Sequence, residues 1–179
     1  PNEFEVIRGA HINPYFLAPT AKQGEDLFLL KEKYLKEHPG SEKALHHRQD
    51  RVVYQRYAAI DMYRRLIATI VPSGNFCSHT VGYLWGDILN PYFLLGLFNS
   101  TLLDWRFTLT STNNNVNGYE LESLPTPEID FTTPADERES IVNAITAEYA
   151  GGRYQLALQR SAAALAQGQT DVVHDVLAH

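Results

Sequence analysis

A chain of 179 residues with 44% hydrophobic and 20% charged residues has the composition of a globular protein, and it is too short for two full enzyme domains. No apolar run approaches the roughly 20 residues that cross a bilayer, so a membrane-spanning helix is excluded. The net charge of −6 and the pI near 5.6 argue against a general nucleic-acid binder.

The cysteine content and the first residues suggest where the chain belongs. The single cysteine, Cys77, excludes an internal disulfide framework and is typical of a reducing compartment, so we expect a cytoplasmic protein. The opening stretch, PNEFEVIRGAHI, has acids where a signal peptide has basic residues before an apolar run, and it lacks an initiator Met. We therefore expect the chain to be part of a longer protein.

Basic residues concentrate in one window of this acidic chain. Residues 43–65 contain six Lys and Arg residues, two Asp residues and two adjacent His residues, which gives a local charge of +4. Such a stripe is suited to an anionic partner, although solvated strand faces and loops also produce such windows.

The first two thirds of the chain predict a mixture of helix and strand. Residues 25–40 have a helical pattern with interleaved charges, and residues 51–59, 64–71 and 76–84 are rich in β-branched and aromatic residues. The short IDMY connection predicts a hairpin and PSGN a turn, so we expect three consecutive antiparallel strands. Residues 91–107 predict an amphipathic main helix, with a break at Asn99 and Ser100.

The last third predicts helices. An asparagine run, Asn113 to Asn117, predicts a turn, and YELESLPTP alternates as an edge strand does before its prolines. Thr133 and Pro134 mark the start of a helix that ends at Gly151, residues 153–167 predict a second helix, and a third from Thr170 is cut short by the end of the chain. The Gly-Gly pair favours an antiparallel helical hairpin.

The predicted fold class is therefore α+β: a twisted, mostly antiparallel sheet with one main helix, followed by a C-terminal helical hairpin. We place a recognition domain at residues 1–131 and a helical segment at residues 132–179.

Motifs for catalysis or metal binding are weak. No Lys is preceded by an acid at nuclease spacing, no Gly-x-Ser-x-Gly elbow occurs, and Cys77 and His79 lack partners for zinc. A dispersed Ser/His/acid arrangement stays open. NPYF, present at residues 13–16 and 90–93, resembles the Asn-Pro-Pro-Tyr signature of amino-methylating DNA methyltransferases, but the second proline and any Gly-x-Gly cofactor turn are missing. We predict no catalytic and no metal-binding residues.

Four stretches, in order, resemble a known family. They are DRVVYQRYA, RLIATIVPSGNFCSHTVGYLW, PYFLLGLFNSTLLDWRF and YELESLPTPEIDFTTPADERESIVNAI, which together span residues 50–145. This order is similar to that in the TaqI-like C-terminal specificity domain of restriction-modification enzymes, which is related to the specificity subunits of type I systems.

The resemblance implies a sequence-specific DNA-recognition domain of a larger type II restriction-modification enzyme. Such an enzyme has an adenine-specific DNA methyltransferase domain in the same chain, and in some cases an endonuclease. The expected partners are double-stranded DNA and that methyltransferase domain. The fragment itself is expected to hold no cofactor, and S-adenosylmethionine is expected in the parent protein.

Candidate DNA contacts follow from side-chain chemistry, because Arg matches guanine and phosphate whereas Asn matches the edge of adenine. They are Lys43, His46, His47, Arg48, Arg51, Arg56, Arg64, Arg65, Asn113, Asn114, Asn115 and Asn117. We expect the segment 37–50 to be the first recognition loop and the asparagine run the second. Arg64 and Arg65 adjoin in a predicted strand and so point to opposite faces. Tyr83, Trp85, Trp105 and Phe107 are expected in the core. The alternative function is a protein-interaction module that docks another subunit or domain through the C-terminal helices.

Overall fold

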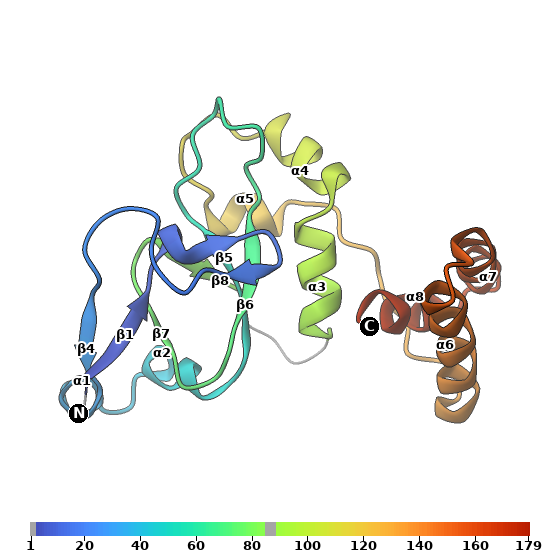
Figure 1. The fold of residues 1–179 in the computed structure, drawn as a ribbon, viewed down its shortest axis with the longest axis horizontal. Helices are drawn as coiled ribbons and strands as arrows, with labels where there is room; N and C mark the ends of the chain where they lie inside the picture. Colours follow the sequence, from blue (N-terminus) through green and yellow to red (C-terminus); the bar gives the residue numbers. More distant parts are fainter. Residues whose placement is uncertain (1–2, 85–88) are drawn as a thin grey trace. The chain divides into compact units, whose positions relative to one another are not determined.

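The computed structural model describes residues 3–84 and 89–179, which form two compact units (Figure 1). Residues 3–84 and 97–124 make the sheet unit, and residues 89–96 and 125–179 make the helical unit. The chain belongs to the α+β class, as the sequence predicts. None of the helices in the described residues is long and apolar enough to span a membrane.

Three small sheets form the sheet unit, rather than the single twisted sheet expected. One has the order β4-β1-β7, the second pairs β2 with β3, and the third has the order β6-β5-β8. The strands are β1 (Glu3–Ile7), β2 (Ile12–Asn13), β3 (Phe16–Leu17), β4 (Phe28–Leu30), β5 (Arg51–Gln55), β6 (Ala68–Val71), β7 (Phe76–Cys77) and β8 (Val81–Tyr83). The pairing of β1 with β7 is parallel and the other pairings are antiparallel.

The predicted consecutive strands are present but shorter and differently connected. β5 lies between β6 and β8, with Val53 opposite both Thr69 and Tyr83. The expected third strand divides into β7, which pairs with β1, and β8, which pairs with β5. Between them the Ser78 Oγ and the Thr80 Oγ1 form a hydrogen bond of 2.7 Å. No tight hairpin forms at IDMY, since residues 56–67 make a long loop.

Short helices connect these strands. They are η1 (Gly9–His11), α1 (Lys31–Glu37), α2 (Glu42–Leu45), η2 (His46–Arg48), α4 (Thr101–Thr108) and α5 (Gly118–Glu122), while α3 (Pro91–Phe98) begins in the helical unit and ends in the sheet unit. The predicted break in the main helix is confirmed, and the Ser100 hydroxyl caps α4 by accepting from the Leu103 amide at 3.2 Å. The helix expected from residue 25 starts only at Lys31.

The edge strand predicted for YELESLPTP is wrong, since Gly118–Glu122 is α5. Asn117 and Glu120 form a capping box: the Glu120 Oε2 accepts from the Asn117 amide at 3.0 Å and from its side chain at 2.8 Å. This local pair favours a helix start more strongly than the alternation of Tyr119 and Leu121 favours a strand.

Buried aliphatic residues hold the sheet unit together. Ile7, Ile12, Val53, Ile67, Val71 and Val81 form its main cluster. Phe107 is fully buried as predicted, but Trp105 is 55% exposed, and with Leu102 and Leu109 it forms an exposed face of α4. Tyr83 packs partly buried against the cluster, and the core position predicted for Trp85 lies outside the described residues.

The helical unit matches the sequence prediction closely. α6 (Ala135–Ala150), α7 (Tyr154–Ala166) and α8 (Thr170–Leu177) contact one another around Val142, Ile145 and Val172. Gly152 and Gly168 have positive φ values of 75° and 78° at the two helix connections, where a Cβ would be strained.

Candidate functional site

A long loop between β5 and β6 projects from the sheet unit. This projecting loop, residues 56–67, extends beyond the strand ends in Figure 1. Tyr63 is 100% exposed, and Tyr57, Ile60 and Met62 are exposed as well. Loops that a rigid scaffold positions often carry binding residues, so this loop is a candidate binding element.

The asparagine run supports one side of the projecting loop. The Asn114 carbonyl accepts from the Ala58 amide at 2.9 Å, and the Asn114 Oδ1 accepts from the Ile60 amide at 3.0 Å. Asn115 forms a β-bridge with Tyr57, and the Val116 amide donates to the Arg56 carbonyl at 2.8 Å. The run therefore forms a bend and a β-bridge that brace the loop, through backbone groups and the Asn114 side chain.

Buried polar groups fix the other side of the projecting loop. The Asp104 Oδ1 accepts from the Arg65 and Leu66 amides at 2.9 and 2.7 Å. Asn99 uses both ends of its amide on Ala68, at 3.1 and 2.9 Å. Arg64 donates to the Asn99 carbonyl at 2.8 Å, so α4 and the segment before it set where the loop rejoins β6.

Arg65 is the largest fully buried side chain, with 1% exposure. Its guanidinium donates to the Asn113 carbonyl at 2.5 Å and to the Ser111 hydroxyl at 3.3 Å, and it lies 5.2 Å from the centre of the Phe107 ring. Burial opposes ionisation of Glu120, but hydrogen bonds from Ser111 and Asn117 and the charge of Arg65 hold its pKa below the ordinary value. The charge of Arg65 is the smallest of these contributions to the pKa of Glu120.

A second group of predicted contacts lies at the start of β5 and is mostly buried. His47 donates from Nδ1 to the Ala44 carbonyl at 2.7 Å and stacks on Phe76. His46 contacts the Tyr83 hydroxyl at 2.8 Å. Burial lowers the pKa of both His46 and His47. Arg51 is buried and donates to the Asn75 carbonyl at 2.5 Å.

The basic window is therefore not one stripe. Arg51 and Arg56 mark opposite ends of β5, and five residues of strand separate them by about 16 Å. Lys43 and Arg48 are exposed at the first end, and Arg56, which donates to the His79 carbonyl at 3.1 Å, is partly exposed at the second. Half of the predicted loop at residues 37–50 is helical, in α2 and η2.

The prediction that Arg64 and Arg65 lie in a strand is wrong, since β6 begins at Ala68. Both arginines are instead held by the segments around Asn99 and Asn113. Their interactions within the fold leave Tyr63 and Asn114 as the exposed residues of this region best placed for a partner.

Three potential metal ligands, Glu5, His11 and Asp26, come within 4.8 Å of one another. The buried His11 accepts at Nδ1 from the Arg8 amide at 3.0 Å, so the proton of the neutral ring resides on Nε2, 3.2 Å from the Glu5 carboxylate. A metal-bound histidine usually donates from its second nitrogen. Because Nδ1 of His11 accepts a hydrogen bond instead of donating one, this arrangement does not favour metal ligation through Nε2.

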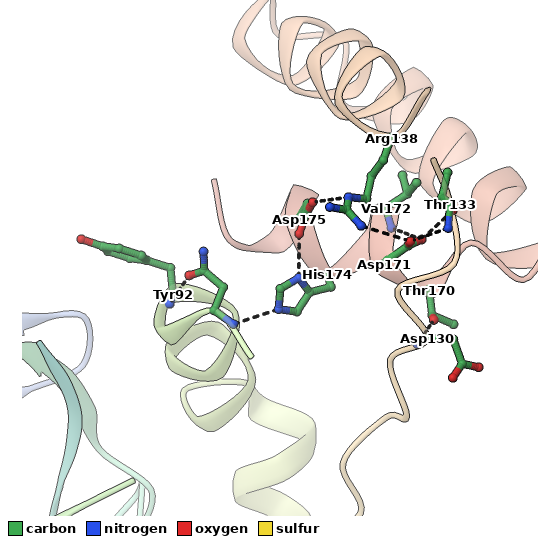
Figure 2. Close-up of polar contacts among 10 residues, drawn as sticks. Tyr92, Asp130, Thr133, Arg138, Thr170, Asp171, Val172, His174 and Asp175 are labelled. Atoms are coloured by element: carbon green, nitrogen blue, oxygen red, sulfur yellow. Dashed lines mark hydrogen bonds and ion pairs between the residues drawn. The ribbon is translucent and has the colours of Figure 1, made fainter. Parts of the chain in front are cut away.

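In the helical unit, a buried carboxylate joins the residues before α6 to α8 (Figure 2). Asp171 is 0% exposed and accepts from the Thr133 amide at 2.9 Å, from the Thr133 hydroxyl at 2.7 Å and from Arg138 at 3.4 Å. Burial opposes its charge, but these hydrogen bonds outweigh burial and lower the pKa of Asp171.

His174, on the same helix, resembles a catalytic base held by an acid, but both its nitrogens are occupied. Nδ1 lies 2.7 Å from the Asp175 carboxylate, and Nε2 accepts from the Asn90 amide at 3.0 Å, as Figure 2 shows. The ring also packs on Phe93 and Phe131. Because Nε2 has no free lone pair, His174 acts as a structural tether for the start of α3.

An apolar groove crosses the ends of the helices in the same unit. Its volume is about 740 Å³, and its lining includes Ile145, Tyr149, Tyr154, Leu158 and Leu177. Several of these side chains are exposed, which makes the groove a candidate protein-docking surface.

Comparison with known proteins gives no independent assignment. A scan against protein-family models finds no match to the chain, and a search of the curated proteins also finds none.

Sequence reasoning missed the residues that shape the projecting loop. Tyr63 lies inside IDMY, which the sequence predicts as a hairpin connection, and Asp104 fits the polar face of the predicted amphipathic helix. Neither position therefore indicates a binding loop from the sequence. The Asn-x-x-Glu spacing of Asn117 and Glu120 was a local signal for the capping box.

Proposed function

We propose that the sheet unit recognises double-stranded DNA through the projecting loop, as the target-recognition part of a larger restriction-modification enzyme. The observation that supports this most is a loop, fixed by hydrogen bonds at both stems, that carries the fully exposed Tyr63 and is contacted at Ile60 by the exposed Asn114. Exposed aromatic and apolar residues at such a tip can enter a groove or wedge between base steps, and an amide can read a base edge.

The distribution of charge favours the sheet unit over the helical unit for DNA binding. Twelve of the fifteen Lys and Arg residues lie in the sheet unit, matched there by twelve acids. The described helical unit has three basic and eight acidic residues. Attraction to phosphates supplies most of the sequence-independent affinity of a protein for DNA. A sheet unit without net charge must therefore bind DNA through local contacts, and the acidic helical unit is unsuited to binding DNA.

The parent enzyme would methylate adenine in the cytoplasm with S-adenosylmethionine, held by the methyltransferase domain of the same parent chain. The chain has no Gly-x-Gly turn that would hold the ribose or carboxylate of that cofactor. Lys43 and Arg48 would contact phosphates, because their side chains are exposed at the other end of β5.

Selection from a randomised duplex library tests this function. The chain should enrich a defined motif, and the affinity for that motif measured by fluorescence anisotropy should fall about five- to 150-fold for Tyr63→Ala, since stacking on one base is worth about 1–3 kcal/mol. Tyr149→Ala, which removes a tyrosine that is 66% exposed in the helical unit, is the control. Failure to enrich any motif, or equal binding by both variants, would contradict the proposal.

The second candidate function is docking of another subunit or domain through the helical unit, favoured by its apolar groove. Here Tyr154→Ala should weaken association with the methyltransferase domain while leaving DNA affinity unchanged. The reverse pattern, in which Tyr63→Ala weakens only the protein contact, would reassign the projecting loop to protein binding.

A further inference from the structure

A cavity of about 500 Å³ lies at the foot of the projecting loop. Tyr57 and Met62 of the loop line it together with Asn13 and Pro14 of the β2–β3 turn. Among the described residues that line it, the charged ones are Arg8 and Lys22, both cationic. The sheet unit as a whole has balanced charge, so a cavity whose charged lining residues are all cationic attracts an anion locally.

Arg8 carries a charge that the protein compensates poorly. Its side chain is only 14% exposed, and Nη2 donates to the carbonyls of Gln23 and Gly24 at 3.1 and 3.3 Å. The Asp26 carboxylate is 3.9 Å from Nη2, and Nε is buried without a hydrogen-bond partner. Asp26 pairs with Arg8 only at the outer limit of an ion pair, and the Nε donor stays unsatisfied, so an anion in the cavity would stabilise the buried guanidinium.

Lys22 contributes the second cation from an exposed position. Its ammonium contacts the Oδ1 of the buried Asn13, a neutral acceptor, so its charge is retained. An ammonium has three donors, and this contact leaves two for a ligand.

The walls of the cavity are preorganised. The Gln55 side chain donates to the Gly9 and Ile12 carbonyls at 2.9 and 2.8 Å, and the Gly9 amide donates to the Thr80 hydroxyl at 2.9 Å. Next to Pro14, Tyr15 has φ of 69°, the one positive φ of a non-glycine among the described residues. Gly or Asn usually occupies this position of a turn, and such strain concentrates at binding sites.

We infer that this cavity binds a phosphate group, and that the phosphate is one of the backbone of the DNA that the projecting loop contacts. The inference rests on the proposed function for the source of the phosphate, since Tyr57 and Met62 belong both to the loop and to the cavity lining. Arg8 and Lys22 supply the charge, and the fixed walls supply the position.

Titrations of the isotope-labelled chain followed by nuclear magnetic resonance separate the sources. Inorganic phosphate, at matched ionic strength against chloride, should shift the amides of Gly9, Asn13 and Lys22. Lys22→Gln should abolish the shifts, Lys22→Arg should restore them, and Lys33→Gln, on exposed α1, should leave them unchanged. On the selected duplex, Lys22→Gln should also lower the salt-dependence slope by about 0.9, the value for one phosphate.

The outcomes distinguish the two proposals. If the duplex binds and depends on Tyr63 while Lys22→Gln and Lys33→Gln behave alike, the cavity assignment is overturned and the DNA function stands. If phosphate shifts the cavity amides but no duplex binds, the DNA source is overturned and the cavity is a site for a free phosphate compound. If neither probe shifts these amides, the inference fails altogether.

Discussion

Replacing Asp104 tests whether the position of the projecting loop depends on one carboxylate. In the wild-type protein, its Oδ1 accepts from two buried amides, those of Arg65 and Leu66, at 2.9 and 2.7 Å. Asp104→Ala leaves both amides without an acceptor. Since each unsatisfied buried amide costs about 1–3 kcal/mol, we expect a loss of about 2–5 kcal/mol in unfolding free energy.

Asp104→Asn retains an oxygen at the same position, so it should keep both hydrogen bonds. Only the contribution of the charge is lost, which we place at about 1 kcal/mol. Asp50→Ala is a control, because its carboxylate accepts from the exposed Ser73 amide at 2.8 Å, and water can replace it. A loss of about 0.5–1 kcal/mol is expected there.

Hydrogen exchange measured by mass spectrometry reads both effects at once. The amides of β5 report global opening of the sheet unit, and peptides covering residues 56–67 report local opening of the loop. Asp104→Ala should raise exchange in the loop first, and it should weaken binding to the selected duplex in parallel. Equal behaviour of the Ala and Asn variants, or a loss below about 1 kcal/mol for Ala, would refute the role assigned to this oxygen.

Three further predictions concern stability and pH. Asp171→Asn should destabilise the helical unit in urea by about 3 kcal/mol, because donors from Thr133 then face an amide group, whereas Asp175→Asn, which is partly exposed, should cost about 1 kcal/mol. Because the pKa of Glu120 is lower in the folded protein, the unfolded chain takes up this proton at higher pH. The stabilisation is therefore present above pH 4.5 and is lost as the pH falls through the folded value. Glu120→Gln should flatten acid unfolding curves of the sheet unit, and an unchanged curve would count against the role of the hydrogen bonds from Ser111 and Asn117. The lowered pKa of His47 has the same consequence: the unfolded state is protonated first below pH 6.5, so stability falls with the pH. His47→Phe, which keeps the stacking on Phe76, should lessen the loss of stability between pH 6.5 and 5. A steeper loss would refute burial as the cause of the shift.

Helix ends were predictable because their signals are local. Ser100 caps α4, Pro134 precedes α6, and Gly152 and Gly168 end the helices before them, each through the backbone preference of the residue itself. The break in the main helix and all three C-terminal helices could therefore be located from the sequence.

Strand extent and the fate of the arginines were not predictable in the same way. Arg64 and Arg65 have neighbours typical of a strand, yet the carbonyl of Asn99, the carboxylate of Asp104 and the carbonyl of Asn113 hold them in a loop. These partners lie more than 30 residues away in the sequence, and no local pattern indicates which of them a long cationic side chain will meet.

By itself the sequence determined the α+β class and the helical hairpin, because caps, glycines and periodicity act over a few residues. Only the tertiary structure decided that the basic window divides between the two ends of β5, and that Arg51 and Arg65 are buried. It also decided that Tyr63, an ordinary residue in the chain, is the most exposed point of a loop fixed at both stems. Exposure and burial follow from which distant segments pack together, and that packing is a property of the whole fold.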